Sequence, residues 1–284
     1  MKLLTKESSP TVKILMSIAI LMTSISFASL LMSFFKYLSP DFALTHSGKL
    51  CIQAIGSLVM FGLPSLLCTW LFTKDFKTNF STIKNKRWLI WAIIIPIASI
   101  PLNDLFLSWN NNLHFEGEEI FRQIQALSEK ESEYLLTSDS FGGFLAISFV
   151  LAMIPAIVEE LFFRGVIQNY LKDLCKNTFV AILLTSAFFS LMHFEIFAFL
   201  PRFFLSILLG YLFVCSKNLI IPIICHFINN FTVCLFYFLY SKEEITSQDT
   251  STFSQQPLLI ISALIILLFI FFFENFFVPL RKKE

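Results

Sequence analysis

Apolar residues dominate this chain in long runs that short polar segments separate. A helix needs about 20 apolar residues to cross the hydrocarbon core of a bilayer, which is about 30 Å thick. Eight runs approach or exceed this length, at residues 12–36, 50–73, 88–108, 141–172, 178–195, 197–215, 218–240 and 256–279. The pattern therefore predicts an all-α, polytopic integral membrane protein with about eight transmembrane helices, which form a single membrane domain over residues 1–284.

The composition supports a membrane protein over a soluble one. Hydrophobic residues make up 56% of the chain and charged residues 14%, whereas soluble domains carry about 25% charged residues. The net charge of +1 gives no reason to expect a nucleic-acid partner. The six cysteines include no CxxC pair, so neither a disulfide framework nor a thiolate zinc site is predicted.

The charges of the loops predict an orientation, because short cytoplasmic loops are enriched in lysine and arginine. Residues 74–87 are basic and residues 110–140 are acidic, which places the first segment inside and the second outside. The remaining loops agree with both termini in the cytoplasm, and we expect an integral protein of a bacterial inner (plasma) membrane. Within residues 110–140, apolar residues at helical spacing predict an amphipathic helix at the outer interface.

Charged residues occur in the middle of the run at residues 141–172. An ionisable side chain at bilayer depth costs about 2.5–3.5 kcal/mol on insertion scales, so such residues usually face a cavity or a partner. Glu159, Glu160 and Arg164 lie together in this run. Glu160 and Arg164 are separated by four positions, so we expect them to pair on one helical face.

Other polar side chains lie in the runs at residues 178–195 and 218–240. The first contains His193, and the second contains His226 with Asn230 one helical turn later. At 1.5 Å per residue, Glu159 and Asn230 lie about 20 Å above the inner boundary, His193 about 22 Å and His226 about 13 Å. A lone membrane histidine is more often a helix–helix hydrogen-bond partner than a catalyst. A set of polar groups in one layer on three runs favours a functional site.

This set suits the hydrolysis of an amide. A glutamate in an apolar cavity can take a proton from water, while a histidine opposite orients that water. An asparagine and a second histidine can donate hydrogen bonds to the developing oxyanion. The HExxH motif of helical zinc proteases is absent. We therefore expect no cofactor, although Glu159, His193 and His226 could together hold one zinc ion.

Three short motifs in a fixed order carry a resemblance to a known family. They are EExxxR at residues 159–164, FxxxH at residues 189–193 and HxxxN at residues 226–230. Over about residues 141–240 the chain resembles the CPBP, or Abi, family of CAAX prenyl endopeptidases and bacteriocin-processing proteins. The resemblance implies a glutamate-type intramembrane protease with eight helices.

The resemblance also implies a role for each motif residue. Glu159 would be the general base on water, with His193 as its partner. His226 and Asn230 would form the oxyanion site. The two supporting residues, which would shape the cavity or contact the substrate, are Glu160 and Arg164.

Residues and resemblance together predict an intramembrane endopeptidase that cleaves a membrane-associated protein or peptide within the lipid bilayer. One alternative is a non-catalytic immunity or scaffold protein of the same fold, in which the polar groups only join helices. Another is an ion-coupled transporter, since buried carboxylates and histidines also relay protons. Transporters usually contain two related halves, and we find no such repeat in the sequence.

Overall fold

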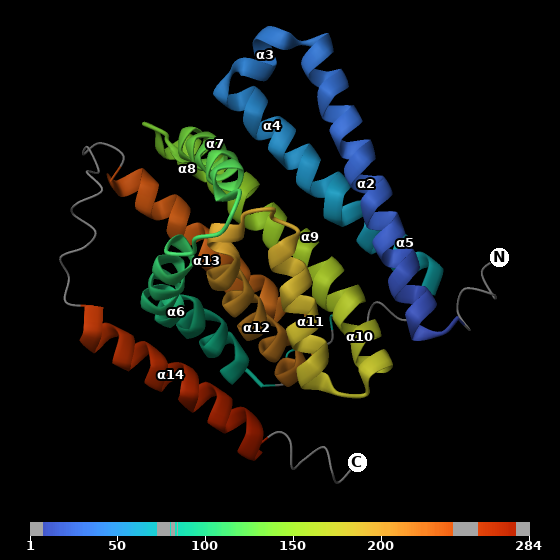
Figure 1. The fold of residues 1–284 in the computed structure, drawn as a ribbon, viewed down its shortest axis with the longest axis vertical. Helices are drawn as coiled ribbons and strands as arrows, with labels where there is room; N and C mark the ends of the chain where they lie inside the picture. The colour runs from blue at the N-terminus through green and yellow to red at the C-terminus, as the bar shows by residue number, and fades with distance from the viewer. Residues whose placement is uncertain (1–7, 73–79, 81–82, 84, 241–254, 277–284) are drawn as a thin grey trace.

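The computed structural model describes residues 8–72, 80, 83, 85–240 and 255–276, and its regular elements over these ranges are all helical (Figure 1). The helices of the first half are α2 (Pro10–Leu38), α3 (Pro40–Leu44), α4 (His46–Ser57), α5 (Leu63–Phe72), α6 (Arg87–Asn111) and α7 (Glu118–Leu136). Those of the second half are α8 (Phe141–Ile147), α9 (Ile154–Phe162), α10 (Gln168–Cys175), α11 (Thr178–Leu191), α12 (Phe199–Ser216), α13 (Ile220–Tyr240) and α14 (Gln255–Phe276).

Six helices in the described ranges are long and apolar enough to cross a membrane. They are Pro10–Leu38, His46–Phe72, Arg87–Asn111, Phe141–Cys175, Ile196–Ser216 and Ile220–Tyr240. Two further predicted spans correspond to shorter apolar helices, Thr178–Leu191 and Leu259–Phe269. The chain is therefore a polytopic integral membrane protein, with six of the eight predicted spans at full length.

The longest of these helices, Phe141–Cys175, combines α8, α9 and α10 with two π-helical segments. The segments η3 (Ser148–Met153) and η4 (Phe163–Ile167) lie on either side of α9. Pro155 follows η3 at the start of α9, where a residue without an amide hydrogen cannot continue the regular ladder. Single π-helical turns often occur at functional sites, and here they enclose the helix that carries both glutamates.

Helices α9, α11, α12 and α13 lie in the middle of the bundle, with α2 and α14 on opposite sides of it (Figure 1). One apolar cluster joins α6, α12, α13 and α14, and a second joins α2, α5, α9, η4 and α11. The motif-bearing helices therefore belong to these clusters, α13 to the first and α9 and α11 to the second. This arrangement explains how charged groups on α9 are kept away from lipid.

Helix α7 is the predicted amphipathic helix between the third and fourth spans. It begins after a left-handed glycine, Gly117. Hydrogen bonds from His114 and Arg122 hold the pKa of Glu118 below its ordinary value. The carboxylate of Glu118 therefore stays ionised in the first turn, where the helix dipole favours a negative charge.

Candidate active site

Helix α9 and the π-turn after it place three charged side chains in the interior. Glu160 and Arg164 are completely buried, and Glu159 is 8% exposed. Arg164 Nη1 donates to Glu160 Oε1 over 2.7 Å, with both side chains inaccessible. The i,i+4 pair predicted from the sequence is therefore confirmed as a buried ion pair.

The second arm of Arg164 reaches a neighbouring helix. Its Nη2 donates to the backbone oxygen of Ser206 over 2.9 Å and to the Ser206 hydroxyl over 2.7 Å. The guanidinium carbon also lies 5.1 Å from the ring centre of Phe189 on α11. Arg164 thus connects η4 with α11 and α12. Its position is fixed by charge-assisted hydrogen bonds, which are the stronger kind. Ser206 gave no signal in the sequence, because single serines are common in apolar helices.

His226 on α13 shares the same carboxylate. Its Nδ1 lies 3.0 Å from Glu160 Oε1 and its Nε2 lies 3.9 Å from Glu159 Oε2. Since a carboxylate oxygen accepts, the hydrogen-bond network assigns the Nδ1 hydrogen to this contact. Glu160 therefore orients the ring of His226, with Nε2 directed to Glu159. The sequence had assigned Glu160 only a supporting role at the cavity wall or the substrate.

His193 lies beyond the end of its helix. The run at residues 178–195 was expected to be helical throughout, but α11 ends at Leu191 and a turn follows. Phe194 adopts a left-handed backbone with φ 56°, which an α-helix does not accommodate. Residues 192–195 remain partly apolar, so hydrophobicity alone did not reveal this end. We name residues 192–198, between α11 and α12, the His193 connection.

The ring of His193 is held by the helix that precedes it. Its Nδ1 lies 2.9 Å from the backbone oxygen of Phe189, and a carbonyl oxygen can only accept. The network therefore places the ring hydrogen on Nδ1 and leaves the lone pair of Nε2 available. The ring of Phe189 is 5.0 Å from that of His193 and 6.0 Å from that of His226. Phe189 thus packs against both histidines.

Asn230 lies one turn after His226 on α13 and is partly buried. Its side-chain oxygen accepts a hydrogen bond from Asn229 Nδ2 over 3.1 Å. This contact assigns the amide nitrogen of Asn230 as the group that can donate elsewhere. Asn230 therefore lies one helical turn after His226, as the sequence predicted. The hydrogen bond from Asn229 sets the orientation of its amide.

The three side chains that could hold a zinc ion are not gathered around one point. Over the residues that the structure describes, no three His, Cys, Asp or Glu side chains are grouped so that they could hold a metal ion. Glu159, His193 and His226 thus do not form a ligand set in this structure. Glu159 and His226 approach each other, whereas the contact of His193 is with the Phe189 carbonyl.

Several residues that the sequence did not single out fix the His193 connection. The amide of Asn110, at the end of α6, donates to the Ile196 oxygen over 2.6 Å and accepts from Leu200 N over 2.8 Å. Glu195 pairs with Arg202 on α12 at 2.5 Å. Asn110 is 1% exposed, yet one asparagine among three in a row carries no recognisable pattern.

The comparisons with known proteins concern the same part of the chain. The family model described as "Type II CAAX prenyl endopeptidase Rce1-like" matches residues 141–232, which contain all three motifs. No curated protein and no solved structure matches the chain. Residues 141–232 therefore form a domain of the Rce1-like type II CAAX prenyl endopeptidase (CPBP, or Abi) family, which is a family of intramembrane peptidases.

Proposed function

We propose that this protein is an intramembrane endopeptidase that hydrolyses a peptide bond of a membrane-associated protein or peptide. The observation that carries the proposal is the pairing of Glu159 with His226 at 3.9 Å in the interior of the helix bundle. The ring of His226 is in turn fixed by Glu160, which Arg164 holds. Contacts of this kind hold catalytic groups in a fixed geometry. An ion pair that only stabilised the fold would not need Glu159 beside Glu160 and Arg164.

In the proposed reaction, Glu159 takes a proton from water while the lone pair of His193 Nε2 orients that water. The water oxygen bonds to the substrate carbonyl carbon. The negative charge that develops on the carbonyl oxygen accepts hydrogen bonds from Asn230 and His226. When the C–N bond breaks, Glu159 returns its proton to the leaving amine. The cleavage thus balances as one water added across one peptide bond.

The proposed role of His226 requires a particular protonation state. Glu160 accepts the Nδ1 hydrogen, so a donor to the oxyanion needs a second hydrogen on Nε2. The ring is then a cation between two carboxylates. Glu160 and Arg164 accordingly act through His226, and we propose no direct contact of either residue with the reacting atoms.

We also propose that the chain crosses the membrane eight times with both termini in the cytoplasm. The Lys13 ammonium lies 5.8 Å from the Tyr170 ring, which supports a common inner side for the start of span one and the end of span four. Asn110 bonds Ile196, which supports a common outer side for the end of span three and the start of span six. The basic residues of the 74–79 stretch and of the C-terminal end lie outside the described residues.

The depth of His193 follows from the short helix before it. The 14 residues of α11 extend about 21 Å, less than the hydrocarbon thickness of about 30 Å. A helix that starts at the inner boundary would therefore deliver the His193 connection within the membrane. This supports a site below the outer surface, at the depth of Glu159.

Comparison of cells that express the wild type or Glu159→Gln tests the proposal. Glu159→Gln keeps the shape of the side chain and removes the proton acceptor. We expect membrane-protein fragments that disappear in this variant and persist in the matched control Glu119→Gln, whose side chain is exposed on α7. Identical fragments in all three strains, with normal levels of each protein, would exclude Glu159-dependent cleavage.

A further inference from the structure

Side chains of helix α7 and of the segment before it contact the His193 connection. Ser128 Oγ donates to Glu195 Oε1 over 2.6 Å. The guanidinium carbon of Arg122 lies 4.1 Å from the ring centre of Phe197, which is 1% exposed. Phe115, just before α7, stacks on Phe197 with ring centres 6.1 Å apart. The second half of the connection is therefore held by α7 and the segment before it.

Glu195 is the residue at which these contacts meet. One of its oxygens accepts from Ser128 on α7 and the other from Arg202 on α12. It lies two residues after His193 and on the far side of the left-handed Phe194. A carboxylate held from both sides restricts the turn that presents His193 to the interior.

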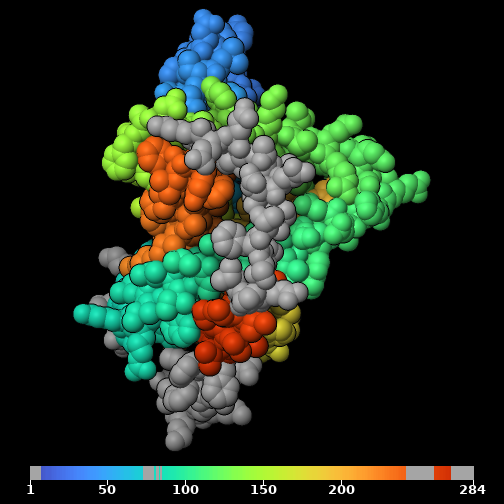
Figure 2. All heavy atoms as spheres, turned by 90° about the vertical axis from the view of Figure 1, so that its left-hand side faces the viewer, coloured from blue at the N-terminus to red at the C-terminus, as the bar shows by residue number. Residues whose placement is uncertain are grey.

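Helix α7 also carries a row of exposed apolar side chains. We name Ile120, Phe121, Ile124 and Leu127 the apolar stripe, and their exposed fractions are 64%, 37%, 47% and 71%. At about 100° per residue Ser128 lies next to Ile124 and Phe121 of the stripe, while Glu119 and Ala126 lie on the opposite side of the helix. Figure 2 shows the green segment that includes α7 projecting to one side of the bundle.

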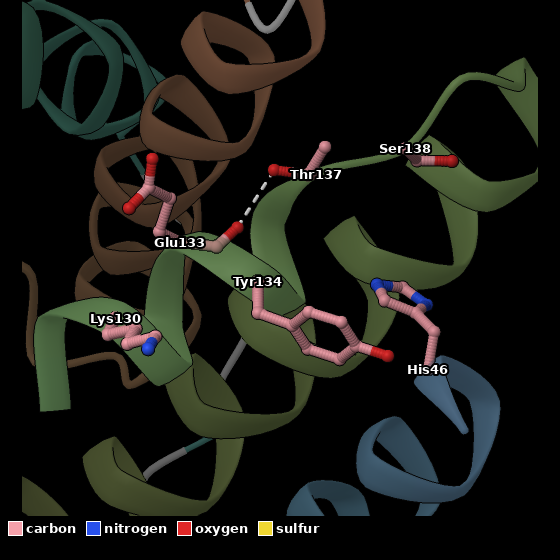
Figure 3. A pocket seen from close by; sticks show the side chains of 6 residues that line it. All are labelled: His46, Lys130, Glu133, Tyr134, Thr137 and Ser138. Carbon is pink, nitrogen blue, oxygen red and sulfur yellow. Dashed lines mark hydrogen bonds between the residues drawn. The ribbon is translucent and has the colours of Figure 1, made fainter. Parts of the chain in front are cut away.

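The ends of α7 keep it at one membrane surface. Helix α6 ends at Asn111, a few residues before α7 starts, and α8 begins at Phe141 soon after α7 ends. The C-terminal half of α7 is fixed to α4, because His46 Nε2 lies 3.1 Å from the Leu135 oxygen and Lys49 pairs with Glu131 at 2.9 Å. Figure 3 shows His46 of α4 beside Tyr134 of α7, with ring centres 5.6 Å apart, where both line a hollow at this junction. The apolar stripe is thus left on the half of α7 that extends beyond these contacts.

We propose that α7 lies in the outer interface of the lipid bilayer along its apolar stripe and from there holds the His193 connection, with Glu195 as a positioning residue for His193. The occupant of the stripe is lipid, because short tethers to two membrane spans keep the helix at the interface. The opposite face is polar and acidic, which suits water and zwitterionic headgroups. Ser128, which bonds Glu195, lies next to the apolar stripe. One helix therefore contacts both the lipid and the His193 connection.

Nitroxide accessibility tests where the stripe lies. Single cysteines replace Ile124 or Leu127 in the stripe, and Glu119 or Ala126 as controls on the opposite side. The background chain carries Cys51→Ser and Cys175→Ser, since the four other cysteines are buried. In phosphatidylcholine nanodiscs, labels at 124 and 127 should be relaxed by oxygen and those at 119 and 126 by aqueous nickel complex. Nickel access at all four positions would overturn the proposal. Protection from both reagents at 124 and 127 would also overturn it, because a protein surface would then cover the stripe.

Hydrogen exchange of residues 192–199 tests the positioning role in the same nanodiscs. Ser128→Ala and Glu195→Gln should speed exchange there by about tenfold to a hundredfold, since each weakens a hydrogen bond to a charged group. Ser128→Thr keeps the hydroxyl and should restore protection. Ser132→Ala, an exposed serine one turn later, should change nothing. Unchanged exchange in both Ser128→Ala and Glu195→Gln would overturn the role of Glu195. Neither measurement depends on peptidase activity. A failure of the proposed role of α7 can therefore be distinguished from a failure of the proposed cleavage mechanism.

Discussion

Replacing Glu160 by methionine should destabilise the protein far more than a comparable change at its surface. The variant keeps roughly the same volume but removes the oxygen that accepts from Arg164 Nη1 and His226 Nδ1. Arg164 is completely buried, so its charge is left without its partner. Removing one member of a buried ion pair costs about 3–5 kcal/mol, and we expect the free energy of unfolding to fall by that amount.

The double variant Glu160→Met/Arg164→Met separates the ion pair from the packing. Apolar replacements for both charges are often neutral, but Ser206 and His226 would each lose a hydrogen-bond partner. Two bonds to Ser206 and one from His226 are lost, so at about 1 kcal/mol for each bond the double variant should lie within about 3 kcal/mol of the wild type. The double variant is thus expected to be more stable than Glu160→Met alone.

Lys49 and Glu131 provide the matched control. This pair has a similar N···O distance of 2.9 Å, but its side chains are 26% and 52% exposed. Exposed pairs contribute about 0–1 kcal/mol, so the cycle of Lys49→Met and Glu131→Met should show a small coupling. Unfolding in mixed detergent–SDS micelles, followed by tryptophan fluorescence, measures both cycles. A coupling in the buried pair no larger than in the surface pair would refute the reasoning.

Three further predictions concern activity and topology. Glu159→Gln should reduce cleavage by the purified protein to background. Asn230→Ala should retain measurable cleavage about 10²–10³ below the wild type, because only one oxyanion donor is lost. Equal cleavage rates for Glu159→Gln and the wild type would contradict the proposed role of Glu159. Cleavage should persist after treatment with strong chelators, and a loss that zinc restores would instead assign Glu159, His193 and His226 as ligands. In intact cells an impermeant thiol reagent should label a cysteine at Ser132 but not at Ile83, and the reverse pattern would invert the topology.

Much of the fold was predictable because a membrane constrains local structure strongly. Backbone groups in lipid must bond within their own helix, so long apolar runs become helices wherever they occur. The expected spans at residues 12–36 and 88–108 correspond to Pro10–Leu38 and Arg87–Asn111. The end of α11 was missed, since Met192 and Phe194 continue the apolar composition through a turn.

The Glu160–Arg164 pair was predictable from the sequence because the period of a helix fixes which residues four positions apart can meet. The contact of His226 with Glu160 and that of Arg164 with Ser206 were not, since each joins separate helices. Which faces meet depends on helix packing, and hydrophobicity cannot distinguish a face that contacts lipid from one that contacts another helix, because both are apolar. The sequence alone thus determined the helices, the motifs and the local ion pair. The tertiary structure decided that Glu160 orients His226, and that α7 reaches the connection that carries His193.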